Sequence, residues 1–246
     1  DIHAGGEDLI FPHHENEIAQ SECCNGVPFA RYWLHNAFLN IDNRKMSKSL
    51  GNFFTVREIG EKYDLQVLRL FMLSAHYRSP LNFSAELMEA SRNSLERIQN
   101  AVGNLNHLLA NASAEELTEE EKELVSQLSS YEEKFDAAMD DDLNTADALA
   151  AIFELVRFAN THAGEESSKA FLSALKEKIV SLSDVLGLIA EKKEEMLDAD
   201  IETLIEERQA ARKARNFARA DEIRNELLSK GIVLEDTREG VKWKRA

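Results

Sequence analysis

Two lysines in a short polar loop are the residues of this chain best suited to chemistry. Lys45 and Lys48 lie three positions apart within Lys45–Ser49, and Leu50–Asn52 follows them. A loop with two cationic side chains can stabilise the negative charge that builds on a departing pyrophosphate. Most lysine pairs belong only to solvated basic loops. The complete five-residue pattern and its continuation favour a phosphate-handling loop over that alternative.

A histidine and a glutamate upstream have the spacing of two metal ligands. His13 and Glu17 lie four residues apart, on one face of a helix that Pro12 is predicted to open. Imidazole and carboxylate both suit zinc, although a plain surface hydrogen bond explains the pair alone equally well. Position 18 is Ile18, so the His-Glu-x-x-His pattern of metalloproteases is absent. Two ligands cannot close a tetrahedral site, so a zinc ion here needs ligands from elsewhere.

The first eight residues combine a glycine pair with a carboxylate. Gly5 and Gly6 allow a ligand to approach the backbone, and Asp8 can accept hydrogen bonds from ribose hydroxyls. A glycine pair followed by an acidic residue is also a common turn. The segment therefore adds only weak support for a nucleotide site.

The net charge of −16 is unevenly distributed along the 246 residues. Residues 196–246 hold eleven basic and eleven acidic side chains, so residues 1–195 carry the whole excess of negative charge. A basic face for nucleic acid is therefore expected only in the C-terminal quarter.

Composition also limits the cellular context. The chain lacks a run of roughly 20 apolar residues, which a membrane span needs. Cys23 and Cys24 are adjacent and cannot staple a fold of this size, so a reducing cytosol is expected. The chain starts at Asp1 within a motif, without an initiator Met or a signal peptide, which suggests a fragment.

Apolar spacing predicts mixed α/β structure up to about residue 55 and helices after it. A strand is expected at 37–41, a helix capped by Asp64 that runs through Leu73, and a longer helix capped by Ser84. Further helices are expected after a Thr118–Glu121 capping box, at 145–162 and at 168–186. The long helix carries an apolar stripe of Leu95, Ile98, Val102, Leu105 and Leu109. These features predict a bundle of about four helices.

An acidic run precedes the helix expected at 145–162. Asp140–Thr145 lacks the glycine and the terminal glutamate of a calcium loop. We interpret it as a helix start that places negative charge at the positive end of the helix dipole.

A second boundary is expected near residues 191–199, followed by two short helices and a hairpin formed by 231–235 and 241–243. Four arginines recur at helical spacing, with a break predicted at Asn216–Phe217: Arg208, Arg212, Arg215 and Arg219. Most charge runs are solvated helix faces. Trp243, set among Lys242, Lys244 and Arg245, favours stacking on unstacked RNA bases instead.

Together these motifs resemble cysteinyl-tRNA synthetases, and the resemblance extends over essentially the whole chain. Asp1–Gln20 is similar to the zinc-and-adenylate segment of that family, and Lys45–Ser49 to the signature loop of class I synthetases. The implied fold is mainly α: a partial Rossmann-type α/β catalytic segment, an antiparallel helical bundle, and a small mixed α/β C-terminal domain with a β-hairpin. The implied domains are 1–54 (catalytic), 55–84 (helical connection), 85–190 (bundle) and 196–246 (anticodon binding).

The resemblance also implies roles for individual residues. His13 and Glu17 would be two of four zinc ligands, the other two being cysteines N-terminal to Asp1, with His3 near the metal. Cys23 and Cys24 do not match those ligands. The adenosine ribose would lie near Gly6 and Asp8, and the phosphates of ATP, with Mg²⁺, near Lys45 and Lys48. The anticodon would be read by Arg212, Asp221, Asp236 and Trp243.

The implied reaction activates cysteine with ATP and transfers it to tRNA(Cys). Zinc would bind the substrate thiolate and disfavour serine, which makes editing unnecessary. The His-x-Gly-His half of the class I site is absent, so the chain alone is expected to be inactive. The resemblance further implies a cytoplasmic monomer.

Two other functions remain open at this point. One is a related ligase that joins cysteine to an amino sugar, whose members lack a tRNA-reading C-terminal domain. The other is a non-enzymatic RNA-binding or scaffold module.

Overall fold

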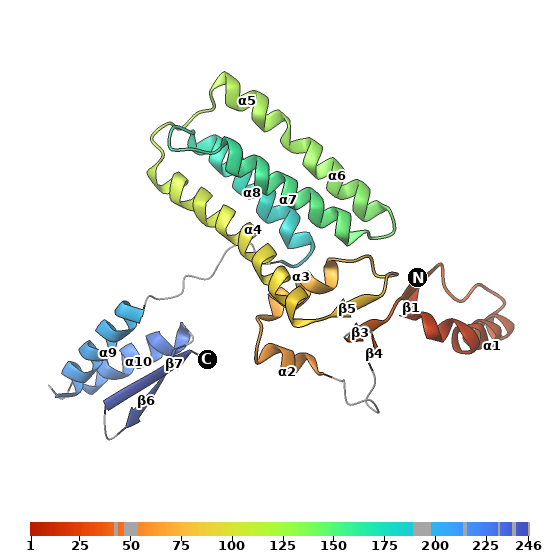
Figure 1. The fold of residues 1–246 in the computed structure, drawn as a ribbon, viewed down its shortest axis with the longest axis horizontal. Helices are drawn as coiled ribbons and strands as arrows, with labels where there is room; N and C mark the ends of the chain where they lie inside the picture. The colour runs from red at the N-terminus through yellow and green to blue at the C-terminus, as the bar shows by residue number, and fades with distance from the viewer. Residues whose placement is uncertain are drawn as a thin grey trace. The chain divides into compact units, whose positions relative to one another are not determined.

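The computed structural model describes residues 1–41, 44–46, 54–188, 198–213, 216–230, 232–237 and 240–245. The chain forms two compact units, Asp1–Lys192 and Lys193–Ala246, and each is described by itself. Both are mainly helical with small sheets (Figure 1), in agreement with the predicted class.

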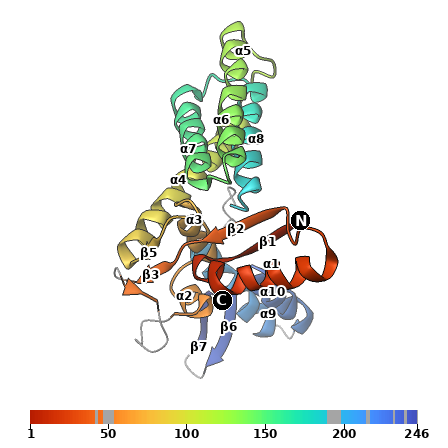
Figure 2. The same ribbon diagram turned by 90° about the vertical axis from the view of Figure 1, so that its right-hand side faces the viewer.

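A β-α-β segment opens the first unit. Strand β1 (Ile2–Gly6) pairs in parallel with β2 (Tyr32–Asn36), and two short helical turns, η1 (Glu7–Leu9) and η2 (Ile10–His14), lead to helix α1 (Glu15–Asn25) between them. Figure 2 shows the two strands side by side, with α1 next to them. The helix was expected to open at Pro12, and the backbone agrees: Phe11 is extended (φ −132°, ψ 133°), and the helical stretch that follows it runs into α1 at Glu15. His13 lies in the first turn of this stretch, ahead of the regular helix that carries Glu17.

A second small sheet follows, interrupted by two helices. Strand β3 (Leu39–Ile41) pairs antiparallel with β4 (Arg44–Lys45) and parallel with β5 (Leu81–Phe83). Between β4 and β5 lie helices α2 (Val56–Gly60) and α3 (Leu65–Leu73). The Asp64 carboxylate accepts from the Gln66 amide and caps α3, as predicted.

The helical bundle contains α4 (Ala85–Asn111), α5 (Glu119–Ser126), α6 (Leu128–Asp140), α7 (Thr145–His162) and α8 (Lys169–Val185). Figure 1 shows these helices lying along one another. Ser84, Thr118 and Ser168 each cap the next helix by accepting a backbone hydrogen bond. The expected start of α4 and the expected bounds of α7 and α8 are confirmed to within a residue or two.

The interior of the bundle consists of the predicted apolar stripes. Leu95, Ile98, Val102 and Leu105 are at most 3 % exposed, and Leu109 packs on their cluster half-buried. One charged residue shares this interior. Glu121 is 7 % exposed and accepts hydrogen bonds from the backbone amides of Thr118 and Ser168, both at 2.8 Å. It therefore joins the start of α5 to the start of α8.

The second unit contains helices α9 (Asp198–Lys213) and α10 (Phe217–Ser229) and strands β6 (Ile232–Thr237) and β7 (Gly240–Arg245). Asn216 caps α10, which confirms the predicted break between the helices. The strands pair antiparallel, and residues 238–239 of the expected hairpin turn lie outside the described part. Ile205, Ile223, Leu227 and Ile232 form the core.

Within the described residues, none of the helices has the length and apolar character that crossing a bilayer requires.

Candidate active-site segment

Three potential metal ligands converge where β1 meets the start of α1. His3 comes from β1, His14 from the last position of η2, and Glu17 from the first turn of α1. One ligand atom from each lies within 4.8 Å of the other two. His3 Nε2 is 2.7 Å from Glu17 Oε2. Two imidazoles and a carboxylate form a donor set that suits zinc.

Aromatic rings enclose this group. His14 is 5 % exposed, and its Nδ1 lies 2.8 Å from His35 Nε2. The His3 ring packs 4.9 Å from Trp33 and 5.0 Å from Phe29, centroid to centroid. A hydrogen bond to one ring nitrogen of a histidine fixes the orientation of the ring, so that the other nitrogen points towards the metal.

The structure groups Glu17 with His14 and His3, while His13 is exposed and lies outside this three-residue group. Glu17 and the neighbouring His3 were predicted from the sequence, whereas His14, Trp33 and His35 were not. The sequence signal for Trp33 and His35 was their spacing, because residues two apart in a strand lie on the same face. Using it required knowing that β2 pairs beside β1.

Neighbouring side chains lie close to the glycine pair. A Cβ atom at Gly5 would lie 2.9 Å from Leu9 Cδ1 and 3.0 Å from His14 Cε1, so a larger residue there would require these side chains to move. A Cβ atom at Gly6 would lie 2.6 Å from Asp8 Oδ1. Gly6 and Asp8, the expected ribose contacts, are therefore adjacent in space.

The signature loop, Lys45–Ser49, starts at the end of a strand. The backbone of Lys45 pairs with Asn40 across the β3–β4 ladder. The Lys45 side chain and residues 47–49, which include Lys48, lie outside the described residues. Met46 lies half-buried in an apolar pocket of about 240 Å³ together with Phe54.

In the second unit, the expected RNA-facing residues differ in exposure. Arg212 on α9 and Asp221 on α10 are exposed, as an RNA contact requires. Arg208 was expected on the same exposed face but is only 4 % exposed, because this side of α9 packs on α10. Arg219 is ion-paired with Glu207 at 2.9 Å and with Glu222 at 2.7 Å.

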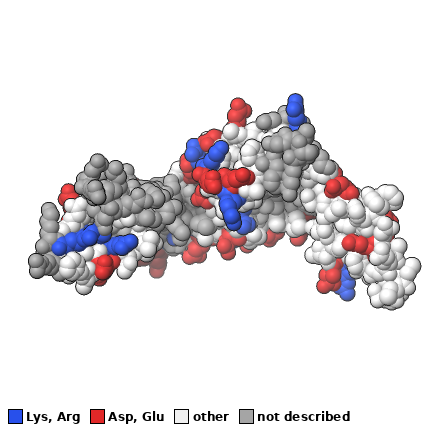
Figure 3. Space-filling model, turned by 90° about the horizontal axis from the view of Figure 1, so that it is seen from below, with Lys and Arg blue, Asp and Glu red and all other residues white. Residues whose placement is uncertain are grey.

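Three further expected contacts cannot be placed. Asp236 lies in β6 and Trp243 in β7, but their side chains, like Arg215 as a whole, lie outside the described residues. On the face seen in Figure 3, basic and acidic side chains are interspersed.

Three protein families match successive parts of the chain. Residues 1–93 match the class I tRNA synthetase (C) catalytic domain, residues 134–191 the DALR domain, and residues 194–243 the cysteinyl-tRNA ligase anticodon binding domain. Among solved structures, the LeuRS of Agrobacterium radiobacter K84 in complex with tRNA and LeuAMS aligns over 79 % of this chain and 27 % of its own, at 19 % identity and a TM-score of 0.60. The methionyl-tRNA synthetase of Mycobacterium tuberculosis with methionyl-adenylate aligns over 76 % and 40 %, at 19 % identity and 0.53. These two show the fold alone, and with the domain matches they define the class as a class I aminoacyl-tRNA synthetase.

Curated relatives narrow the class. The cysteine–tRNA ligases of Lachnospira eligens, Lachnoclostridium phytofermentans and Symbiobacterium thermophilum are 66 %, 60 % and 57 % identical over the whole chain. The chain spans about half the length of each, 52 %, 53 % and 52 %. It belongs to the cysteinyl-tRNA synthetase family, of which it matches the C-terminal portion: the end of the catalytic domain, the DALR domain and the anticodon-binding domain.

Proposed function

We propose that this chain provides the signature loop, part of the metal site and the tRNA-reading unit of an enzyme that activates cysteine with ATP and transfers it to tRNA(Cys). The observation that carries the proposal is the 66 % identity over all 246 residues to a cysteine–tRNA ligase. The match of residues 194–243 to an anticodon binding domain favours this enzyme over a cysteine ligase that acts on an amino sugar.

Each part of the chain has a proposed task. Residues 1–54 bind cysteine and adenylate, and residues 55–84 connect them to the helical bundle of residues 85–190. Residues 196–246, with their hairpin, read the anticodon. Both cysteines are free and exposed, which fits a reducing cytoplasm.

A zinc ion fits the group around Glu17. The structure places His3 and His14 against this carboxylate, whereas the family resemblance pairs Glu17 with His13. A zinc ion bound here would act as a Lewis acid that prefers the soft thiolate of cysteine to the hydroxyl of serine. The half-buried aromatic rings bury the His14 ring, while the Glu17 carboxylate stays exposed.

Substitution of Glu17 tests the metal group in the chain as it is. Glu17→Gln is expected to weaken zinc binding about 10- to 100-fold, because the carboxylate supplies a charged ligand that an amide does not replace. Zinc affinity is measured by competition with a chromophoric chelator. Glu15→Gln, an exposed carboxylate in the same helical turn, is the matched control and should leave the affinity unchanged.

Separate His13→Ala and His14→Ala variants assign the imidazole ligand. Equal zinc affinity in the wild-type chain and in Glu17→Gln would rule out this site.

The reacting phosphates would lie near Lys45 and Lys48. Cationic side chains at this point stabilise the charge that develops on pyrophosphate as the cysteine carboxylate attacks the α-phosphate of ATP. Gly6 leaves room for the adenosine, and the adjacent Asp8 carboxylate would accept a hydrogen bond from the ribose. These assignments are supported by the spacing of Gly6 and Asp8 and by the family match of residues 1–93.

Anticodon reading is assigned to Arg212, Asp221, Asp236 and Trp243. Exposed arginine contacts phosphates or base edges, carboxylates accept from base amino groups, and tryptophan stacks on unpaired bases. The exposure of Arg212 and Asp221 supports the first two roles.

A filter-binding experiment tests tRNA recognition by this chain. The 246-residue chain is expected to bind tRNA(Cys) more tightly than a non-cognate tRNA, with an affinity that falls as salt rises. Removal of residues 196–246 should reduce the affinity at least about tenfold, since one stacked base alone contributes roughly 1–3 kcal/mol. If the chain does not bind at low salt, or if its affinity is unchanged by the truncation, the tRNA-reading assignment is wrong.

A further inference from the structure

The turn between α6 and α7 has a backbone that residues other than glycine rarely adopt. Asp142 and Leu143 both have left-handed φ values, 56° and 57°. Aspartate tolerates this region, but a leucine with a left-handed backbone is strained. Two such residues in succession persist only where contacts with the rest of the fold maintain them.

Those contacts come from the loop between α3 and β5. The Tyr77 hydroxyl donates to Asp142 Oδ1 at 2.8 Å, and the Arg78 guanidinium lies 2.8 Å from Asp142 Oδ2. Arg78 Nε also donates to the Tyr77 oxygen at 3.1 Å. His76 Nε2 lies 3.1 Å from the Asp142 carbonyl oxygen. Three consecutive side chains therefore converge on one residue that lies more than 60 positions away in the sequence.

The same loop is attached to the small sheet that leads to the signature loop. The amide of Ala37 donates to the Tyr77 carbonyl at 2.9 Å, and the amide of Leu81 donates to the Phe38 carbonyl at 3.1 Å. Ala37 and Phe38 lead directly into β3, whose partner β4 ends at Lys45. The 74–80 loop thus lies between the bundle and the strands from which the signature loop starts.

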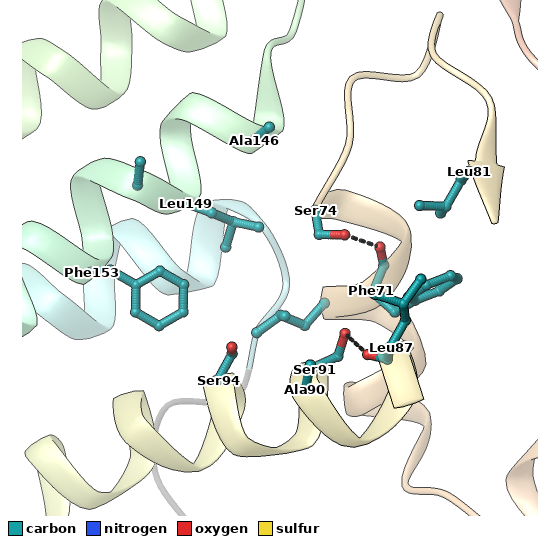
Figure 4. Close-up of a pocket in the computed structure, with 12 residues that line it drawn as sticks. Phe71, Ser74, Leu81, Leu87, Ala90, Ser91, Ser94, Ala146, Leu149 and Phe153 are labelled. Carbon is teal, nitrogen blue, oxygen red and sulfur yellow. Dashed lines mark hydrogen bonds between the residues drawn. The ribbon is translucent and has the colours of Figure 1, made fainter. Parts of the chain in front are cut away.

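Apolar packing also joins the two sides of this junction. Val67, Leu70 and Phe71 of α3 are at most 3 % exposed and belong to the bundle core. A surface pocket of about 360 Å³ opens beside them between α3, α4 and α7 (Figure 4), lined by side chains that include Phe71, Leu149 and Phe153. The Ser74 hydroxyl at its edge donates to the Phe71 carbonyl rather than across the junction. The Thr145 hydroxyl does cross the junction and donates to the Leu73 carbonyl at 2.9 Å. The contacts at Asp142 add to this bond and are the ones that reach the 74–80 loop.

We propose that Asp142 is a positioning residue that ties the helical bundle to the β3–β4 strands, from which the signature loop starts. The inference rests on the proposed function for its catalytic consequence, because that function places Lys45 and Lys48 on the phosphates. Asp142 itself touches no substrate. It acts through Tyr77 and the Tyr77–Ala37 hydrogen bond.

Amide hydrogen exchange in the 246-residue chain tests the structural step. Asp142→Asn keeps a residue that tolerates a left-handed backbone and removes only the charge. Exchange at Ala37 is expected to accelerate roughly 3- to 30-fold, the range for loss of a coupling contact. Exchange within α8, far along the bundle core, should stay unchanged. Asp141→Asn, at the exposed neighbouring residue, is the matched control and should leave Ala37 unaffected.

A change confined to residues 76–78 and 142–143 would show a purely local contact and overturn the proposal, as would unchanged exchange throughout. The catalytic step is tested in a chimera in which residues 1–246 replace the matching region of the Lachnospira eligens ligase. Asp142→Asn should lower kcat of cysteine-dependent ATP–pyrophosphate exchange roughly 3- to 30-fold, the range for loss of a coupling contact. The KM for cysteine should stay unchanged. An inactive unsubstituted chimera contradicts the proposed function, whereas an active chimera with an unchanged Asp142→Asn variant contradicts this inference.

Discussion

Replacing Glu121 with glutamine is expected to lower the free energy of unfolding of the bundle by about 3 kcal/mol. In the structure one carboxylate oxygen accepts from the Thr118 amide and the other from the Ser168 amide. The amide oxygen of glutamine can still accept one of these hydrogen bonds. Its NH2 group replaces the other oxygen, so a donor then faces a backbone N–H, which is also a donor. Loss of a charge-assisted hydrogen bond and an unsatisfied buried donor each cost roughly 1–3 kcal/mol. Urea unfolding of the 246-residue chain at pH 7, followed by circular dichroism, measures the change.

The matched control is Glu120→Gln in the same turn of α5. Glu120 is exposed, and its substitution removes the same charge from the same helix start. A loss of less than about 0.5 kcal/mol is expected there. If Glu121→Gln and Glu120→Gln have equal effects, the buried contacts of Glu121 do not support the bundle.

The contribution of Glu121 also has a defined pH dependence. Burial raises the pKa of this carboxyl, but hydrogen bonds from Thr118 and Ser168 outweigh burial, so the pKa is lowered overall. A carboxyl with a lowered folded-state pKa stabilises fully above its unfolded-state pKa, about 4.3, and loses that contribution as pH falls through the folded-state value. The difference between the wild-type chain and Glu121→Gln should therefore be constant from pH 7 to about 5 and shrink below about pH 4.

Much of the bundle could be predicted because its determinants are local. Asp64, Ser84 and Thr118 mark helix starts through hydrogen bonds that span three residues or fewer. The apolar spacing from Leu95 to Leu105 indicates which face of α4 is buried. Both kinds of evidence are contained within one turn or one helix.

The metal group could not be predicted in the same way, because it depends on contacts between distant segments. The i,i+4 spacing of His13 and Glu17 is helical, but the side chains that approach Glu17 are His3 and His14, and His13 is exposed. Bringing His3 to Glu17 depends on β1 pairing with β2, a strand that the sequence argument did not identify. Arg208 is a similar case, since helical spacing does not reveal which side of α9 packs on α10.

The proposed function makes this chain part of a cysteine-activating, tRNA-charging enzyme. The chimera with the Lachnospira eligens ligase tests it without any assumption about where the native protein begins. Because the two sequences are 66 % identical over the exchanged region, the junction should preserve the contacts between the halves. Its loop lysines should then act on the same phosphates as those of the ligase.

The deciding measurement is ATP–pyrophosphate exchange by this chimera with cysteine and with serine. We predict exchange that depends on cysteine, with little exchange when serine is supplied, and a loss of about 10²- to 10³-fold in kcat on Lys48→Ala, the size expected when one transition-state charge contact is removed. Lys62→Ala, at an exposed lysine outside the loop, should leave the rate unchanged. A folded chimera that binds tRNA(Cys) but shows no cysteine-dependent exchange would contradict the proposed function. Exchange at an undiminished rate in Lys48→Ala would contradict it as well.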